Sequence, residues 1–344
     1  MHSPSLRHDA ASAIPLTALR VRRGCARAAA LLALLAPLAD AASAGPLAER
    51  MIERSAAPVG EAVLEEVDEA PTSAAFPPPG TRLIREVAYG PDAQQRFDVY
   101  APSQTSGAPV LLMVHGGGWA RGDKGSHGVV ENKVARWVPR GFIVVSTNYR
   151  LLPAAGPVEQ ARDIARALAA AQSKAAAWGG DRNRFVLMGH SAGAHLVALL
   201  GASPALAREE GAAPWLGTVI LDTAALDVVG TMEARHLPLY DRAFGSDPAY
   251  WRAASPHHAL AGAAAPVLGV CSTRRRDSCP QLTRFAAKAA PLGMRVSVLK
   301  QNLSHRDINR DLGLAGSYTE LVEAFIGTLD TGMARLLANP QADR

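Results

Sequence analysis

Apolar positions recur along this chain in two alternating patterns, one typical of buried strands and one typical of helices. Continuous apolar runs at 109–115 and 142–148 match strands that are buried on both faces. Apolar residues at helical spacing follow in longer segments, as at 157–178 and 192–200. Because strands and helices alternate in this way, the pattern predicts an α/β fold with a mostly parallel central sheet and helices on both of its faces.

The same patterns predict the remaining elements of the fold. The further predicted strands are 83–89, 96–100, 184–188, 218–222, 266–271 and 295–300, and the further predicted helices are 132–140, 281–290 and 317–329. Residues 228–264 fit neither pattern, so an irregular insertion is expected there. Functional sites in such folds form in the loops at the carboxyl ends of the strands, so candidate functional residues are expected in these loops.

Composition allows one sizeable domain and gives little support to nucleic-acid binding. The chain has 344 residues, 48% of them hydrophobic, which is enough for a single substantial core. The first 44 residues hold five arginines and two aspartates, so they supply three of the five net positive charges. The sequence shows no basic patch with interleaved aromatic residues, and no nucleic-acid partner is expected.

Residues 1–44 have the pattern of a secretory signal. Four arginines between positions 20 and 27 precede the apolar run 28–38, and small residues at 42–44 suit cleavage. The run is shorter than the roughly 20 residues of a membrane span, so we expect export to the periplasm or the medium without a stable membrane anchor. A disordered alanine-rich tail is the alternative. Residues 45–80 are expected to form a loosely structured leader before one domain at 81–335.

One serine lies between two glycines immediately after a predicted strand. In Gly189-His190-Ser191-Ala192-Gly193 the glycines allow a tight turn from strand to helix, which would expose the Ser191 hydroxyl as a nucleophile. The five-residue pattern alone is weak, because a serine in an ordinary turn can also produce it. The strand before it and the helix after it make the nucleophile the stronger interpretation.

A run of three glycines follows another predicted strand. In His115-Gly-Gly-Gly-Trp119 the bare backbone can approach a substrate oxygen, and fixed N–H groups stabilise the negative charge that acyl transfer builds there. We assign the donors of this oxyanion hole to Gly117, Gly118 and Ala192. A flexible glycine turn is the alternative, and His115 is expected to brace the loop.

Four motifs in order resemble the α/β-hydrolase fold. Besides the glycine and serine motifs they are NYRLLP at 148–153 and GGD at 179–181, and the resemblance covers about residues 80–330. The similarity is greatest to the carboxylesterase and feruloyl-esterase-like branch, and arylformamidases are also similar. The resemblance implies a serine hydrolase whose triad follows the order Ser, then Asp or Glu, then His. It also implies that the insertion at 228–264 lies above the site as a lid or acyl pocket.

His305 is the candidate base, because the resemblance places the base after the last strand and no other histidine lies there. A histidine on a surface loop is the alternative. His195 lies in the helix predicted after the serine and is expected to pack or to face solvent. His257 and His258 could line the pocket.

Asp277 is the candidate acid, since it is the only carboxylate that closely follows the strand predicted at 266–271. An acid at this place holds the histidine tautomer and stabilises the imidazolium. Three arginines separate Asp277 from the strand, where the family pattern has a glycine-containing turn, so a surface aspartate paired with arginine is the alternative. Asp227 is the second candidate, and Asp222 is expected to serve the structure.

Two cysteines, Cys271 and Cys279, flank the candidate acid and are the only ones beyond the signal. In an oxidising compartment such a pair tends to form a disulfide, which would restrain the arginine-rich turn between them. A core position for Cys271 is the alternative, and the sequence leaves both open. The Cys and His spacings of zinc sites are absent, as is a nucleotide-binding loop, so neither a metal nor an organic cofactor is expected.

The motifs together favour a serine hydrolase that cleaves a small-molecule carboxylic ester through Ser191, Asp277 and His305. An arylformamidase-like or other amide hydrolase would use the same groups and is the alternative. A non-catalytic binding protein is least favoured, because nucleophile and base are both present. The insertion carries aromatic residues that would contact an aryl ester or only pack against each other. They are Tyr240, Phe244, Tyr250 and Trp251. The sequence leaves the oligomeric state open.

Overall fold

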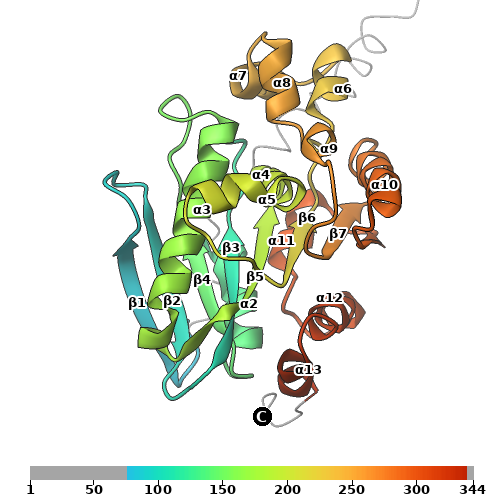
Figure 1. Cartoon of the computed structure of the whole chain (residues 1–344). Coiled ribbons are helices and arrows are strands. Elements are labelled where there is room, and N and C mark those ends of the chain that lie inside the picture. The colour runs from blue at the N-terminus through green and yellow to red at the C-terminus, as the bar shows by residue number, and fades with distance from the viewer. Residues whose placement is uncertain (1–75, 339–344) are drawn as a thin grey trace, which may run out of the picture. The chain divides into compact units, whose positions relative to one another are not determined.

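The computed structural model describes residues 76–338 (Figure 1). The expected signal at 1–44 and nearly all of the expected leader at 45–80 lie outside the described residues, so both stay predictions. Within the described part, no helix combines the length and the apolar character that a membrane crossing requires.

An eight-stranded sheet forms the centre of the described domain. Its order is β1-β2-β4-β3-β5-β6-β7-β8. β1 and β2 are antiparallel at one edge, and the other six strands run parallel to one another. The strands are β1 (Thr81–Ala88), β2 (Arg96–Pro102), β3 (Ala108–Val114), β4 (Ile143–Thr147), β5 (Gly180–His190), β6 (Gly217–Leu221), β7 (Val267–Ser272) and β8 (Val296–Gln301). The predicted α/β fold with a mostly parallel sheet is confirmed.

The third strand shows why this sheet needs continuous apolar runs. Every residue of its sequence APVLLMV is buried. Val110, Leu112 and Val114 belong to one hydrophobic cluster, whereas Leu111 and Met113 belong to the cluster on the opposite face. Because successive side chains of a strand point to opposite faces, a sheet covered on both sides requires apolar residues at every position.

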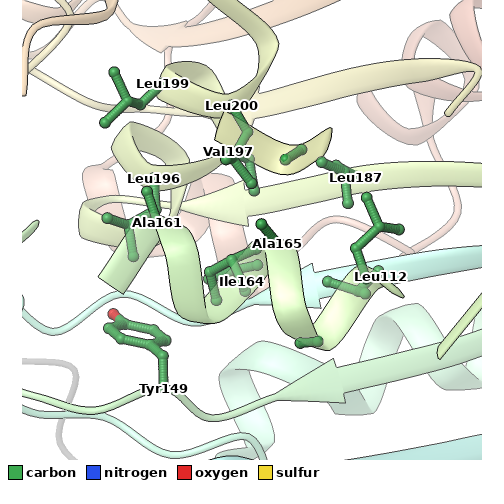
Figure 2. Close-up of a cluster of buried hydrophobic side chains, with 14 of the residues drawn as sticks. Leu112, Tyr149, Ala161, Ile164, Ala165, Leu187, Leu196, Val197, Leu199 and Leu200 are labelled. Atoms are coloured by element: carbon green, nitrogen blue, oxygen red, sulfur yellow. The ribbon is translucent and has the colours of Figure 1, made fainter. Parts of the chain in front are cut away.

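Helices α3 (Pro157–Lys174) and α4 (Ala192–Ala202) cover one face of the sheet (Figure 2). Ala161, Ile164 and Ala165 of α3 lie in the same buried cluster as the side chains of α4. All eleven residues of α4 are buried, which is typical of a helix enclosed by the core on every side. The start of α4 is therefore a rigid position for a functional group.

Other helices cover the opposite face and the ends of the sheet. The second hydrophobic cluster joins the sheet to α2 (His127–Trp137), α11 (His305–Arg310), α12 (Ser317–Gly327) and α13 (Thr331–Leu337). A third cluster packs α10 (Ser278–Ala289) with α4 and β7. The short elements are α5 (Pro204–Glu209), η1 (Ala175–Trp178) and η2 (Ala290–Leu292).

The insertion at 228–264 is helical, and the expectation of an irregular segment was wrong. Its helices are α6 (Val228–Glu233), α7 (Pro238–Phe244), α8 (Pro248–Ala253) and α9 (Pro256–Ala259). Three of them begin at a proline, whose fixed φ suits the first helical position and whose missing N–H is not needed there. Helices this short cannot show a helical period in the sequence. Figure 1 shows them grouped at one end of the sheet.

Candidate active site

Ser191 occupies a tight turn between β5 and α4. Its φ of 55° lies in the left-handed region, which is unusual for a residue with a side chain. A Cβ at Gly189 would lie 2.4 Å from the Gly193 oxygen, and a Cβ at Gly193 would lie 2.4 Å from the backbone oxygens of Val114 and His115. Both glycines are therefore required by close backbone approach, as the nucleophile interpretation of the motif predicts.

His305 lies between Ser191 and a buried aspartate. Its Nε2 is 2.9 Å from Ser191 Oγ, and its Nδ1 is 2.6 Å from Asp222 Oδ2. His305 is the first residue of α11, and Ser304 caps that helix by accepting the Asp307 N–H. The predicted pairing of Ser191 with His305 is therefore present in the structure.

The acid beside His305 is Asp222, and the prediction of Asp277 at this position was wrong. Asp277 is 51% exposed and lies 3.4 Å from the Arg275 Nε, so it matches the alternative of a surface aspartate paired with arginine. The second candidate, Asp227, instead caps α6 by accepting the Gly230 N–H.

Sheet order explains the position of Asp222. It directly follows β6, which is the neighbour of β5, and Ser191 N–H donates to the backbone oxygen of Leu221. One residue further along, the fully buried Asp222 is thus held beside the nucleophile. A carboxylate at the very end of an apolar strand was the available signal in the sequence, and it was interpreted as structural.

Four donors hold the Asp222 carboxylate. Oδ1 accepts from Ser272 N–H at 2.8 Å and from Ser278 Oγ–H at 2.5 Å. Oδ2 accepts from His305 Nδ1–H and, at 3.0 Å, from Arg275 Nη1–H. Burial alone would raise the pKa of Asp222, but the hydrogen bond and charge of His305, together with Arg275 and Ser278, hold that pKa below its usual range. The group is a carboxylate at neutral pH.

His305 is neutral at neutral pH. Burial lowers the pKa of His305 to about 4, and the nearby charges of His190 and Arg275 act in the same direction, while Asp222 opposes them. His190 Nε2–H also donates to the His305 backbone oxygen at 2.9 Å, and the two rings lie 4.4 Å apart. A neutral imidazole that donates Nδ1–H to Asp222 leaves Nε2 free to accept the Ser191 proton.

The glycine loop lies against the start of α4. Gly117 and Gly118 have φ values of 106° and 59°, and a Cβ at Gly117 would lie 2.2 Å from the Arg121 oxygen. The His115 ring stacks on Tyr149 at 4.6 Å, and Tyr149 O–H donates to the His115 oxygen. His115 therefore braces the loop, as expected.

Trp119 anchors the end of this loop in the core. Its backbone oxygen accepts from Gln160 Nε2–H at 2.8 Å, and its indole N–H donates to His195 Nδ1 at 3.2 Å. His195 Nε2–H in turn donates to the Ala254 oxygen. Complete burial lowers the pKa of His195 to about 4, so this ring is a neutral packing residue, one of the two roles expected for it.

A small pocket of about 20 Å³ opens beside Ser191. Its walls include Gly118, Ser191, Ala192, Leu239, Tyr240 and Arg275. Gly117 is not part of this lining, and its oxygen closes the loop by accepting the N–H groups of Ala120 and Arg121. The volume has room for about one water molecule, so only small groups fit without movement of the walls.

The insertion contributes to this pocket through α7. Tyr240 lines the pocket, whereas Phe244 packs against the Trp119 ring with 5.0 Å between ring centroids. Trp251 N–H donates to the Gly245 oxygen, within the insertion itself. Phe244 and Trp251 thus make internal contacts, whereas contact between Tyr240 and an aryl ester stays a prediction.

Other polar side chains of the insertion lie outside this pocket lining. His258 Nδ1 is 2.9 Å from Ser255 Oγ, and the His257 backbone oxygen accepts from Lys288. Neither histidine lines the pocket, contrary to expectation. No group of three or more potential metal ligands occurs among residues 76–338.

Cys271 and Cys279 form a disulfide, with 5.1 Å between their Cα atoms. It joins the end of β7 to the start of α10 and closes the arginine-rich turn. The sequence had left this pairing open. The loop it closes lies against Asp222 rather than holding Asp277 near the base.

Known proteins resemble the central part of this chain in sequence. The BD-FAE family model, which describes feruloyl-esterase-like hydrolases, matches residues 97–224. Esterase LipC of Mycobacterium tuberculosis (strain ATCC 25618 / H37Rv) is 36% identical over 119 residues, which cover 34% of this chain and 29% of that protein. Isoprenylcysteine alpha-carbonyl methylesterase ICME of Arabidopsis thaliana is 35% identical over 118 residues, covering 34% and 27%. The match thus spans less than a third of the length of either relative.

Solved structures resemble most of this chain in fold. Esterase B from Lactobacillus rhamnosis (HN001) superposes with a TM-score of 0.61 at 20% identity, over 84% of this chain and 95% of that one. A truncated carbohydrate esterase from gut microbiota gives a TM-score of 0.63 at 15% identity, over 76% and 100%. The chain has the α/β-hydrolase fold.

Most of the candidate site lies within the segment that matches the family model. Residues 97–224 include the glycine loop, Ser191 and Asp222, while His305 lies beyond that range. The family resemblance that the motifs indicated is therefore confirmed.

Proposed function

We propose that this α/β-hydrolase is a serine esterase that cleaves small carboxylic esters through an acyl-enzyme. The observation that carries the proposal is the continuous hydrogen-bonded line from Asp222 through His305 to Ser191, which lines a small pocket together with Gly118 and Ala192. Nucleophile, base and orienting acid are each within hydrogen-bond distance of the next. The esterase names of the relatives support the same reaction.

The first half of the reaction forms the acyl-enzyme. His305 Nε2 accepts the Ser191 proton while Oγ attacks the ester carbonyl. Asp222 stabilises the resulting imidazolium and holds its Nδ1–H in place. The N–H groups of Gly118 and Ala192, which both line the pocket, stabilise the oxyanion. Collapse of the tetrahedral intermediate breaks the bond to the alcohol, which leaves with the proton from His305.

The second half returns the free enzyme. A water molecule gives a proton to His305 and attacks the acyl carbon, and the same N–H groups stabilise the second oxyanion. Ser191 leaves with the His305 proton, and the carboxylic acid is released. No metal or organic cofactor takes part in this scheme.

The size of the pocket favours esters of short acids. Leu239 and Tyr240 of α7 line the same pocket as Ser191, and the volume of this pocket is about 20 Å³. An acetyl group fits with small adjustments, whereas a long acyl chain requires α7 to move. We therefore expect p-nitrophenyl acetate to be a better substrate than the octanoate.

A substrate panel tests the proposed function. Purified protein and its Ser191→Ala variant are assayed with p-nitrophenyl esters of graded acyl length and, in parallel, with N-formylkynurenine. The proposal expects ester hydrolysis that declines with chain length and is absent in the variant. Hydrolysis of the formamide at a much higher kcat/KM than any ester would favour the arylformamidase alternative instead.

We also propose that the protein is exported. The basic and apolar pattern of residues 1–44 supports this, and a disulfide between Cys271 and Cys279 suits an oxidising compartment. Expression of the full chain in a bacterial host, followed by fractionation and N-terminal sequencing, tests it. A mature protein that begins near residue 45 outside the cytoplasm is expected, and an intact N-terminus in the cytoplasm would contradict the proposal.

A further inference from the structure

Three of the four donors to the Asp222 carboxylate come from a single short loop. They are the Ser272 N–H, the Arg275 guanidinium and the Ser278 hydroxyl. All three lie between the two cysteines of the disulfide, in a segment that we call the arginine loop (residues 272–278). The arginine loop is therefore built around the acid of the site, although the acid itself belongs to β6.

Arg275 has the most specific position in this loop. Its Nη1 lies 3.0 Å from Asp222 Oδ2 and 2.9 Å from His305 Nδ1, and its side chain is only 15% exposed. Because Nδ1 carries a proton when it donates to Asp222, Arg275 cannot also donate to that nitrogen. Two donors, one of them a full positive charge, therefore converge on the same carboxylate oxygen.

This arrangement has two physical consequences. The guanidinium restrains Asp222 from the side opposite to Ser272 and Ser278, which fixes the oxygen that His305 uses. A permanent positive charge within hydrogen-bond distance of the imidazole also disfavours its protonated form. In a serine hydrolase the acid alone already sets the histidine tautomer. The mechanism therefore requires that Asp222 be held in position, but it does not require a positive charge beside the imidazole.

We propose that Arg275 is a positioning residue that acts through Asp222 and keeps the His305 base neutral, and therefore active, in acidic solution. The inference rests on the proposed function, because it concerns the base of that same site. It assigns the disulfide-closed arginine loop a task in setting the pH range of the enzyme. Arg275 itself need not touch the reacting atoms to do this.

The charges around His305 agree with this assignment. The titratable and charged groups of neighbouring elements are His190 of β5, Asp222 after β6, Tyr240 of α7, Arg275 of the arginine loop and Tyr318 of α12. Burial is the largest cause that lowers the pKa of His305, with His190 and Arg275 adding to it and Asp222 opposing it. Arg275 is the only one of these neighbours that carries a positive charge at every pH of interest.

The test compares pH profiles of Arg275→Gln, Arg275→Lys and the wild type. Arg276→Gln is the matched control, because Arg276 lies in the same loop, is exposed and has no contact with Asp222 or His305 among the hydrogen bonds of the described residues. Two rates are followed from pH 4 to 9, namely kcat/KM for p-nitrophenyl acetate and the second-order rate of phosphonylation by a fluorophosphonate probe. Circular dichroism at each pH confirms that every variant is folded.

We expect the acid limb of both pH profiles to move in Arg275→Gln only. In Arg275→Gln the limb shifts to higher pH by about one unit, as expected for loss of a like charge at this distance. Arg275→Lys retains most of the wild-type limb, and Arg276→Gln retains all of it. A uniform loss of rate in Arg275→Gln at every pH, without a shift of the limb, would mean that Arg275 only supports the loop and would overturn the proposal.

A readout independent of turnover separates this inference from the proposed function. The His305 ring is titrated by NMR with ¹⁵N-labelled histidine, and its signal is assigned with His305→Gln. The pKa of His305 should rise in Arg275→Gln and not in Arg276→Gln. A wild type that neither turns over esters nor reacts with the probe would refute the esterase, whereas a reactive wild type with an unshifted His305 titration in Arg275→Gln refutes only the role of Arg275.

Discussion

Replacement of Asp222 by asparagine should disable the His305 base while it preserves the shape of the site. The Ser272 N–H and the Ser278 hydroxyl both donate to Oδ1, so the amide oxygen must take that position. The amide NH₂ then occupies the place of Oδ2, where it faces His305 Nδ1, 2.6 Å away in the wild type. Two donors cannot share that contact, so the imidazole must adopt the other tautomer.

The expected loss of activity is large. In the other tautomer Nδ1 accepts from the amide and Nε2 carries the proton, so Ser191 has no base. The same acid-to-amide change in a serine protease lowers kcat about 10⁴-fold through this tautomer effect, and the structure gives no reason to expect less here. Arg275 also loses its buried counter-charge, so some loss of stability should accompany the loss of activity.

The assay compares kcat for p-nitrophenyl acetate in Asp222→Asn and Asp277→Asn, with thermal melting of both proteins as the control for folding. The Asp277 side chain is 51% exposed and forms an ion pair with Arg275 rather than with His305, so its variant should retain activity within a few-fold of the wild type. If Asp277→Asn is the more damaging of the two at comparable stability, the assignment of the acid is wrong.

Three further predictions concern the surroundings of the site. Cys279→Ser removes the disulfide to Cys271 and should lower the free energy of unfolding in denaturant by about 2–3 kcal/mol. It should also reduce kcat, and an unchanged kcat would show that the loop keeps its conformation without the disulfide. Leu239→Ala should widen the pocket and raise kcat/KM for p-nitrophenyl octanoate relative to kcat/KM for the acetate. An unaltered ratio would show that the acyl group does not bind in this pocket. Gly193→Ala should fail to fold or lose several degrees in Tm, because its Cβ would lie 2.4 Å from two backbone oxygens, and a wild-type melting curve would contradict that packing.

Much of the fold could be predicted because long buried strands and helices have recognisable patterns of apolar residues in the sequence. Strands such as β3 require apolar residues at every position, and the long helix α3 shows its period over many residues. The helices at 228–264 show no such pattern of apolar residues. Each has seven residues or fewer, and they are defined by starting prolines and capping aspartates rather than by a period.

The site was predicted as far as local motifs define it. The turn at Ser191 depends on glycines within two residues of it, and His305 was identified by its place after the last strand. The acid was missed because its position depends on which strands are neighbours in the sheet. Asp222 is 31 residues from Ser191 in the chain, yet β5 and β6 pair directly, and Ser191 N–H bonds to the residue before Asp222. Sequence order alone does not reveal that adjacency.

Covalent labelling decides whether Ser191 is the nucleophile. The wild type is treated with a fluorophosphonate probe at neutral pH, digested, and examined by tandem mass spectrometry, in parallel with Ser191→Ala and His305→Gln. We expect one phosphonate adduct, on Ser191, that is absent in Ser191→Ala and forms far more slowly in His305→Gln. Full labelling of Ser191→Ala at another residue, or no reaction of the folded wild type, would contradict it.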